Sequence, residues 1–261
     1  PYKDQFINET ATVVKKLEEA GAILVAKLVS GALARGDVWF DGKTKNPWDT
    51  TQGASGSSAG SGSATSAGLV PFALGTETLG SITSPSTRNG VTGLRPTYGR
   101  VSRHGVMSLS WSMDKVGPLG RNAEDCAIVF EAIQGKDEND LTTVDLTFGV
   151  DWKKDYKNLR VAYLKKDIEK DTTESGKNLR NALKSLKEMG IEPTAVEMPE
   201  AVPYRGFDII LRAEAGAFFD ELVRSGGVDI MVEQDQRSRA NSLRQSRFIP
   251  AVEYIQANRQ R

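Results

Sequence analysis

A run of small residues at positions 56–63 constrains the fold of this chain more than any other feature of its sequence. The run reads Gly-Ser-Ser-Ala-Gly-Ser-Gly-Ser and leads, through further alanine and serine, into an apolar segment at 69–74. Glycine allows backbone conformations and close approaches that side chains forbid. Because alanine and threonine alternate with the serines as far as Gly68, we expect a helix packed closely on a strand, and not a flexible Ser/Gly linker.

A second glycine-rich segment follows the apolar one. Residues 75–81 read Gly-Thr-Glu-Thr-Leu-Gly-Ser, so that Ser57 and Ser81 are separated by one expected helix and one expected strand. A serine in glycine-rich backbone can present its hydroxyl and neighbouring N–H groups to one substrate atom. Two such serines predict acyl-transfer chemistry.

Together these segments resemble the amidase signature family, whose pattern runs Gly-Gly-Ser-Ser-Gly-Gly-Ser, a small-residue helix, Gly-Leu-Val-Pro and Gly-Thr-Asp-Thr-Gly-Gly-Ser-Ile. The likeness continues through residues 90–102 and 112–119 and ends near Asp125. Residues 21–28 and 45–49 resemble the strand and loop that precede this pattern in the family. The resemblance therefore covers residues 9–135 closely and the remainder loosely.

The resemblance implies an α/β fold, in which helices cover a mixed β-sheet core. Alternating helical and strand-like segments agree with that expectation. We expect a helix at 8–20, a buried strand at 22–26, and a β-α-β unit formed by segments 159–164, 174–189 and 191–198. The helix should be capped by Asn8 and terminated by Gly21.

The domain organisation follows from the same comparison. We expect one amidase signature domain over residues 1–261, incomplete at both ends, because the chain opens without methionine and closes inside a helical pattern. Its parts would be a core with the serine site at 9–135, a polar surface connection at 136–158 and a second α/β portion at 159–261.

The resemblance assigns catalysis to the two serines. Ser81 would attack the amide carbonyl, and Ser57, placed in a cis peptide bond, would connect it to a lysine base in a Ser-Ser-Lys triad. The oxyanion hole would consist of backbone N–H groups, those of Thr78, Leu79, Gly80 and Ser81.

Two departures from the family pattern leave the subgroup and the substrate open. The family usually has glycine where this chain has Leu79, and arginine where it has Thr83. A backbone N–H survives the first change, but the leucine side chain should narrow the pocket.

The lysine base is expected outside these residues. In the family it lies upstream in an apolar segment that ends in Lys-Asp, and this sequence contains no such segment. Lys27 is an alternative base, since burial lowers the pKa of a lysine, or else it is a strand-end lysine that reaches solvent. The 261 residues alone are therefore expected to be inactive on amides.

Residues 56–60 also match the nucleophile elbow of α/β-hydrolases, with Ser58 attacking and His104 as base. An elbow follows a buried strand, whereas residues 45–55 are polar, and Glu77 is the single carboxylate between the two residues. This interpretation is the weaker one.

Other chemistry-bearing residues have structural interpretations. We expect His104 in a loop at the pocket rim and Cys126 as a buried thiol on an apolar helix face. Asp114 either orients the site loop or forms a turn. The arginines between 237 and 247 are expected on a solvated helix face and not in an RNA site.

Composition limits the partners and cofactors. Lysine plus arginine and aspartate plus glutamate both number 34 in 261 residues, so that no net charge attracts nucleic acid or anionic membrane. No apolar run reaches the length of a membrane-spanning helix. One cysteine and one histidine exclude an internal disulfide and a Cys/His zinc cluster, and no metal or organic cofactor is expected. The single cysteine agrees with a cytoplasmic location, and both a monomer and a homo-oligomer are compatible with the sequence.

The function predicted is hydrolysis of a carboxamide, in a small-molecule or peptide-like substrate, through an acyl-Ser81 intermediate. Two alternatives stay open. One is a glutaminase or amidotransferase component that releases ammonia, and the other is an inactive fragment or scaffold that retains the fold.

Overall fold

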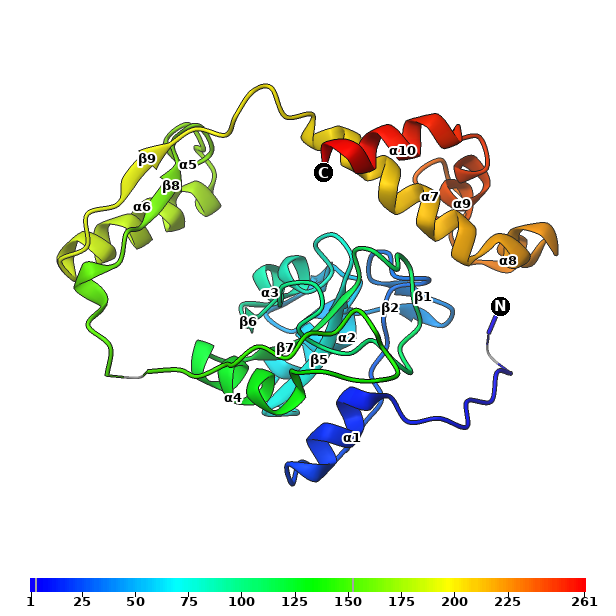
Figure 1. Ribbon diagram of the computed structural model, residues 1–261, viewed down its shortest axis with the longest axis horizontal. Helices are drawn as coiled ribbons and strands as arrows, with labels where there is room; N and C mark the ends of the chain where they lie inside the picture. The colour runs from blue at the N-terminus through cyan, green and yellow to red at the C-terminus, as the bar shows by residue number, and fades with distance from the viewer. Residues whose placement is uncertain (3, 152) are drawn as a thin grey trace. The chain divides into compact units, whose positions relative to one another are not determined.

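The computed structural model describes residues 1–2, 4–151 and 153–261, which form two compact units (Figure 1). The larger unit contains Pro1–Gly149 and Gly206–Arg261, and the smaller one contains Val150–Arg205. In the described ranges, no helix has the length and apolar character needed to cross a bilayer.

The larger unit contains short α-helices. They are α1 (Thr12–Glu19), α2 (Ala59–Ser66), α3 (Thr83–Asn89), α4 (Ala123–Ile133), α7 (Asp208–Phe218), α8 (Asp220–Arg224), α9 (Arg239–Ser246) and α10 (Ala251–Gln260). A short 3-10 helix lies at Gly227–Ile230, and another lies at Tyr204–Phe207, where the chain leaves the smaller unit. The strands are β1 (Val38–Trp39), β2 (Gly42–Lys43), β3 (Lys45–Asn46), β4 (Asp49–Gly53), β5 (Phe72–Glu77), β6 (Thr92–Gly93) and β7 (Lys115–Gly120).

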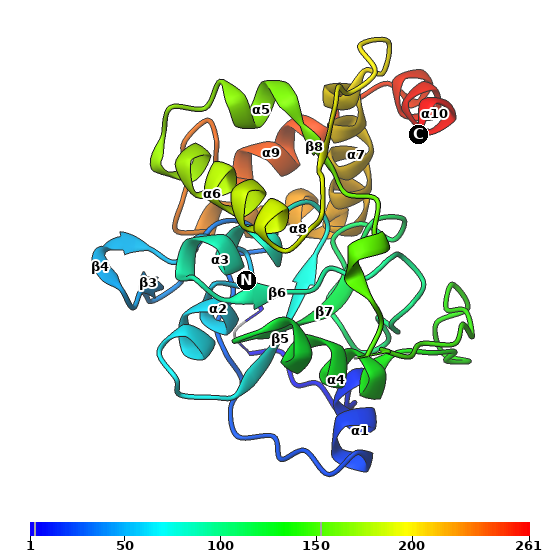
Figure 2. The same ribbon diagram turned by 90° about the vertical axis from the view of Figure 1, so that its left-hand side faces the viewer.

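An antiparallel sheet with the strand order β5-β7-β6 lies at the centre of this unit. Alternate residues of β5 are buried, as expected for a strand with one face against a core. Helix α2 packs on β5 and α4 packs on β7, and both ribbon views show them against the sheet (Figures 1 and 2). The register pairs Glu77 with Lys115, so that the turn after β5 and the start of β7 lie side by side.

The small residues of α2 permit this packing. A Cβ atom added to Gly60 would lie 2.5 Å from the backbone oxygen of Val29. Two hydroxyls at the start of α2 also hydrogen-bond to the neighbouring strand, because Ser61 Oγ donates to Leu74 O at 2.7 Å and Ser58 Oγ donates to Thr76 O at 3.1 Å. The run at 56–63 therefore begins a tightly packed helix, which confirms the prediction.

Two apolar clusters support the unit. One joins α1, β7 and α4 through Val13, Val101, Val116, Phe130 and Ile133. The other joins α7 and α9, and its buried members are Leu109, Ala215, Phe219, Val228, Met231, Ala240 and Leu243. Leu109 belongs to the loop before β7, so this loop is anchored in the second cluster.

The predicted buried strand at 22–26 is wrong. Ile23, Leu24 and Val25 are 85%, 65% and 70% exposed, and no strand of the described residues pairs with them. A buried strand requires neighbours that satisfy its backbone and cover its side chains. Contact with α2 begins only beyond this stretch, where Gly60 N donates to Val29 O at 2.9 Å.

The first helix is shorter than predicted. It begins at Thr12, and its N-cap position is occupied by Ala11, whose side chain makes no capping hydrogen bond, so Asn8 is not the cap. Its end agrees with the prediction, since Gly21 follows with a φ of +88°, in the left-handed region that glycine favours.

The smaller unit is built around a β-α-β segment. Its elements are a 3-10 helix at Tyr156–Asn158, β8 (Ala162–Leu164), α5 (Lys165–Glu169), α6 (Glu174–Glu188) and β9 (Thr194–Val196). Strands β8 and β9 pair in parallel, and the crossover between them contains α5 and α6. Thr173 caps α6 by accepting from Gly176 N at 3.4 Å. The β-α-β prediction is confirmed, and with it the α/β fold class.

Candidate active site

The fold brings the two signature serines into neighbouring backbone segments. Ser58 N donates to Ser81 O at 3.1 Å, and Gly31 N donates to Ser57 O at 3.0 Å. The peptide bond between Gly56 and Ser57 is cis, as the resemblance implies. Ser57 and Ser81 are 2% and 9% exposed. Both serines are therefore buried. Ser57 lies just before α2, and Ser81 lies in the turn that follows β5.

A cavity of about 200 Å³ opens beside these segments. Ser81, Gly56, Thr78 and Leu79 line it. The hydroxyls of Ser57 and Ser81 hydrogen-bond to no residue of the described ranges, so neither is committed to a structural contact. Leu79 is 63% exposed and borders this cavity, as expected from its replacement of a glycine.

The turn before Ser81 is held by Glu77. Its Oε2 accepts hydrogen bonds from Ile82 N at 2.8 Å and Thr83 N at 2.9 Å. Burial works to raise the pKa of this carboxyl, but three backbone N–H groups and the nearby Arg95 guanidinium outweigh it, so the pKa lies below its usual range. A charged carboxylate thus fixes the backbone around the turn.

This anchoring decides which N–H groups of the turn are free. The Gly80 N–H is directed to the Glu77 carboxylate. By contrast, the N–H groups of Thr78, Leu79 and Ser81 meet no acceptor within the part of the chain that the structure describes. Gly80 itself has a φ of +88°, which allows the turn that separates these donors.

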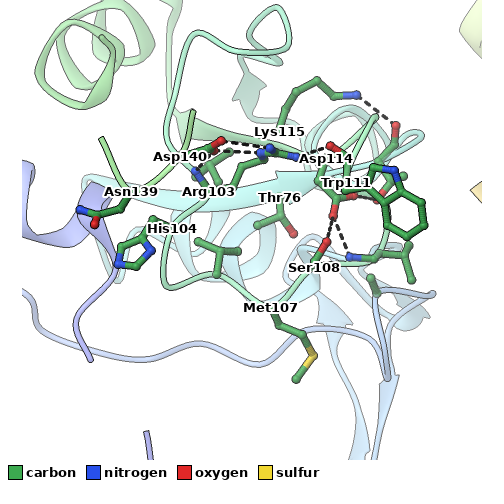
Figure 3. Close-up of a pocket in the computed structure, with 15 residues that line it drawn as sticks. Thr76, Arg103, His104, Met107, Ser108, Trp111, Asp114, Lys115, Asn139 and Asp140 are labelled. Carbon is green, nitrogen blue, oxygen red and sulfur yellow. Dashed lines mark hydrogen bonds and ion pairs between the residues drawn. The ribbon is translucent and has the colours of Figure 1, made fainter. Parts of the chain in front are cut away.

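Thr78 is held by two residues at the start of β7, Asp114 and Lys115. Its Oγ1 donates to Asp114 Oδ1 at 2.5 Å, and Lys115 Nζ donates to Thr78 O at 3.1 Å (Figure 3). Asp114 Oδ2 also accepts from Leu109 N at 2.7 Å and Ser110 N at 2.9 Å. Asp114 therefore orients the loop before β7 and joins it to the turn that carries Ser81.

Lys115 is a residue of the site that the sequence analysis missed. Burial lowers the pKa of its ammonium below the usual value, and the positive charge of Arg95 acts in the same direction, against two nearby carboxylates. It lines a second cavity of about 250 Å³ with Thr78 and His104 (Figure 3). The sequence did offer a signal for this lysine, because it directly follows Asp114 within the segment 112–119 that resembles the family pattern.

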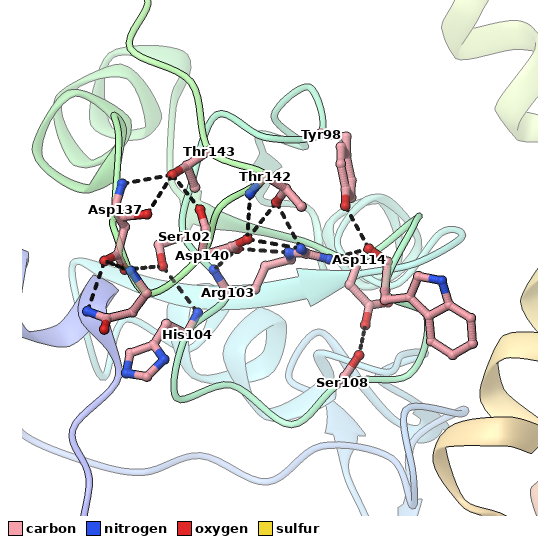
Figure 4. A network of polar contacts seen from close by, with 12 residues as sticks. Tyr98, Ser102, Arg103, His104, Ser108, Asp114, Asp137, Asp140, Thr142 and Thr143 are labelled. Carbon is pink, nitrogen blue, oxygen red and sulfur yellow. Dashed lines mark hydrogen bonds and ion pairs between the residues drawn. The ribbon is translucent and has the colours of Figure 1, made fainter.

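A polar network closes the far side of that second cavity (Figure 4). Arg103 Nε pairs with Asp140 Oδ2 at 3.1 Å, and hydrogen bonds from Arg103 and Thr142 overcome burial and hold the pKa of Asp140 well below its usual range. Burial also works to raise the pKa of Asp137, but hydrogen bonds from Ser102 and other donors lower it to about 2. The network ties residues 137–143 to the segment before the site loop.

The elbow interpretation has no geometric support. Ser58 Oγ both donates to Thr76 O and accepts from Thr76 N, each at 3.1 Å, so it is a bridge between α2 and β5. His104 lies in a loop at a cavity edge, as expected, and its Nε2 is 2.7 Å from Glu9 Oε1.

Glu214, a buried residue of α7 outside the signature segments, holds the loop before β7. It accepts from the hydroxyls of Ser110, Ser112 and Tyr254, the last two at 2.7 and 3.0 Å, and from Ser112 N at 3.1 Å. No local pattern marked this glutamate, because Ser110 lies 104 positions away in the chain.

Three further candidates have structural roles or none. Lys27 is exposed and makes no hydrogen bond or ion pair with the rest of the described chain. Cys126 is buried, its thiol donates to Thr92 O at 3.4 Å, and burial raises its pKa, as expected of a structural cysteine. The arginines at 237–247 do not form one solvated face, because Arg239 is 6% exposed. It packs against residues 33–34, so the prediction is wrong for this residue.

Among the described residues, no group of three side chains has the composition and placement of a metal site.

Comparison with known proteins decides the family. The amidase family model matches residues 2–257. The chain belongs to the amidase family. The A subunit of the glutamyl-tRNA(Gln) amidotransferase of Staphylococcus epidermidis is 40% identical over 228 residues, which are 84% of this amidase-family chain and 46% of that protein.

Solved structures agree. The corresponding amidotransferase chain of Thermotoga maritima superposes with a TM-score of 0.77 at 32% identity, covering 96% of the chain and 56% of that structure. The peptide amidase of Stenotrophomonas maltophilia gives a TM-score of 0.80 at 26% identity, with 98% and 59% covered. The chain thus spans about half the length of the curated relatives it matches.

Proposed function

We propose that this chain carries the acyl-transfer site of an amide-hydrolysing enzyme, with Ser81 as nucleophile and Ser57 as the group that relays its proton. The observation that carries the proposal is that two buried serines with uncommitted hydroxyls lie in neighbouring backbone segments, and that Ser81 lines a cavity next to backbone N–H groups that meet no acceptor in the described chain. Membership of the amidase family supports the same assignment.

The proposed reaction proceeds in two steps. Ser81 Oγ attacks the amide carbonyl carbon while its proton passes to Ser57 and on to a base. The oxyanion that forms accepts from the N–H groups of Thr78, Leu79 and Ser81. The C–N bond then breaks, the leaving nitrogen takes a proton, and water hydrolyses the acyl-Ser81 ester to release the acid.

The base in this proposal is a lysine outside residues 1–261. Of the two lysines considered within them, Lys27 is exposed and makes no hydrogen bond or ion pair in the described chain. Lys115 donates to Thr78 O and hydrogen-bonds to neither serine hydroxyl. Lys115 has a different role here. A cation on the carbonyl oxygen of the Thr78–Leu79 peptide polarises that peptide and makes the Leu79 N–H a stronger donor to the oxyanion.

Covalent labelling tests the nucleophile. The full-length protein, treated with a fluorophosphonate, should carry the label on the peptide that contains Ser81. Ser81→Ala should abolish both labelling and amide turnover, and Ser57→Ala should reduce turnover by about a hundredfold or more, as expected for a relay that has lost one member. Cys126→Ala is the matched control and should retain activity. A label on Ser58 would instead support the elbow.

Comparing chains of different length tests the base. We expect no amide turnover from residues 1–261 alone, turnover from the protein extended upstream through an apolar Lys-Asp segment, and none from that extension with the lysine changed to alanine. Robust turnover by the short chain would contradict this and point to Lys27.

A second candidate function is the release of ammonia from glutamine as one component of an amidotransferase. It is favoured by the 40% identity with such a protein. Glutamine hydrolysis that is stimulated by a partner protein would support it, whereas turnover of unrelated carboxamides without a partner would support a free-standing amidase. Absence of both labelling and turnover in the full-length protein would leave an inactive scaffold.

A further inference from the structure

Lys115 places an ammonium group on one peptide of the turn that carries Ser81. Its Nζ donates to Thr78 O at 3.1 Å (Figure 3), and among the described residues no carboxylate forms an ion pair with it. The C=O and N–H groups of a trans peptide point in opposite directions. The cation therefore lies on one side of the Thr78–Leu79 peptide, and the Leu79 N–H, which meets no acceptor in the described chain, lies on the other.

The ammonium belongs to a row of charges on neighbouring segments. The register of β5 and β7 pairs Glu77 with Lys115, and Arg95 Nη1 lies 3.7 Å from Glu77 Oε1. Burial lowers the pKa of Lys115, and the charge of Arg95 lowers it further, whereas Glu77 and Asp114 act to raise it. Arg95 is thus the one nearby charge that favours the neutral amine.

The other titratable groups around the same cavity are engaged elsewhere. Arg103 Nε pairs with Asp140 Oδ2 at 3.1 Å, and His104 Nε2 lies 2.7 Å from Glu9 Oε1. These two pairs keep their charges to themselves. The charge state of Lys115 therefore depends mainly on its burial and on the row that begins at Arg95.

Thr78 does not depend on Lys115 for its position. Its Oγ1 donates to Asp114 Oδ1 at 2.5 Å, and the preceding residue, Glu77, is held in the β5–β7 register. These anchors remain when the ammonium loses its proton. What the proton loss removes is the positive charge on the Thr78 carbonyl, and not the turn itself.

We propose that the charge of Lys115, and not only its hydrogen bond, supports turnover, and that Arg95 controls the pH at which this charge is lost. A charged donor polarises a peptide more strongly than a neutral one, so the Leu79 N–H binds an oxyanion better while Lys115 is protonated. Lys115 is thus a positioning residue that acts through a peptide group. The inference rests on the proposed function, because it takes the Leu79 N–H as part of the oxyanion hole.

The pH profile of the full-length protein tests the charge. After the rise that the lysine base produces, kcat/KM should fall by about threefold to tenfold as Lys115 loses its proton, a part of the roughly hundredfold that one oxyanion-hole donor supplies. Lys115→Met should have the lower rate throughout and no fall. Lys115→Arg stays charged at every pH tested and should keep most of the rate without the fall. The loss in Lys115→Met should lie in kcat, with KM unchanged.

Variants of Arg95 should move the fall without altering the lysine. Arg95→Gln removes a nearby positive charge, so the pKa of Lys115 rises and the fall should shift upward by about half a pH unit at low salt, and by less at high salt. Arg95→Lys keeps the charge and should leave the fall in place. The matched control is Arg121→Gln, an exposed arginine directly after β7, which should leave the fall in place too.

A purely structural role for Lys115 predicts a different outcome. If the side chain only held the turn, Lys115→Arg and Lys115→Met would lower kcat/KM alike and the shape of the pH profile would not change. Absence of the fall in the unmodified protein, its persistence in Lys115→Met, or a fall that Arg95→Gln does not move would overturn the inference. Circular dichroism at each pH verifies that the variants are folded.

An oxyanion analogue provides an independent readout. Trifluoroacetone forms a bond from its carbonyl carbon to Ser81 Oγ, the serine proton passes to the relay, and the carbonyl oxygen becomes the oxyanion. Its affinity should fall by about threefold to tenfold in Lys115→Met and be retained in Lys115→Arg. Equal affinity in Lys115→Met and the unmodified protein would refute the inference. Failure of Ser81 labelling would refute the proposed function instead.

Discussion

Glu214 should stabilise the larger unit because it links helix α7 to the loop that bears Asp114. Glu214→Ala removes the acceptor of four hydrogen bonds. The Ser110 hydroxyl is fully buried and the Ser112 N–H is part-buried, so water replaces the lost acceptor poorly. At about 1–3 kcal/mol for each buried donor left unpaired, the free energy of unfolding should fall by about 3–5 kcal/mol.

Urea unfolding, followed by circular dichroism, measures this change. The midpoint should fall while the m-value stays constant, and the melting temperature should drop by roughly 6–20 °C for a unit of this size. Glu214→Gln keeps one oxygen acceptor and should cost less. Glu131→Ala, an exposed position on α4, should change stability by less than about 0.5 kcal/mol. A loss below about 1 kcal/mol in Glu214→Ala would show that these hydrogen bonds are replaced by water.

Three more outcomes are expected. Gly60→Ala should cost about 1–3 kcal/mol in a denaturation experiment, because its Cβ would lie 2.5 Å from a backbone oxygen, whereas Gly149→Ala, with nothing within 4 Å, should not. Because the pKa of Asp140 is lower in the folded than in the unfolded protein, its ionised carboxylate stabilises the fold above the unfolded pKa near pH 4, and this stabilisation is lost as the pH falls further. In acid titrations, Asp140→Asn should therefore lower the free energy of unfolding at about pH 7 and make its decline below about pH 4 less steep. In the full-length protein, kcat/KM should rise towards alkaline pH as the lysine base loses its proton, and His104→Gln should keep this rise; its loss would make histidine the base.

The sequence was sufficient where the signal is local. The small residues at 56–63 predict a closely packed helix, since only such residues tolerate backbone contacts like that of Gly60 with Val29. The β-α-β segment follows from a helix flanked by two apolar segments. Placement of Ser57 in a cis peptide bond came from the family resemblance, and no propensity would have suggested it.

The remaining features depend on contacts between distant parts of the chain. The apolar residues at 22–26 have the composition of a buried strand, but a strand also needs a partner, which composition does not reveal. Glu214 and Arg239 gain their roles from backbone or hydroxyl groups 104 and 206 positions away. Lys115 escaped notice because a lysine at the start of a strand is ordinarily solvated.

The glycines around the serine segments cannot be replaced by larger residues without a steric clash, whereas other positions near the serines can. A Cβ on Gly62 would lie 2.9 Å from Asn89 Nδ2, and one on Gly75 would lie 2.7 Å from Leu119 Cδ1, so larger residues would displace the reacting groups. The cavity wall formed by Leu211, Arg212 and Ser242 comes from helices far along the chain, and none of these three residues is fully buried. New substrate preferences should therefore arise from mutations at these three positions, and a directed-evolution library confined to them would leave Glu214 and the nucleophile in place.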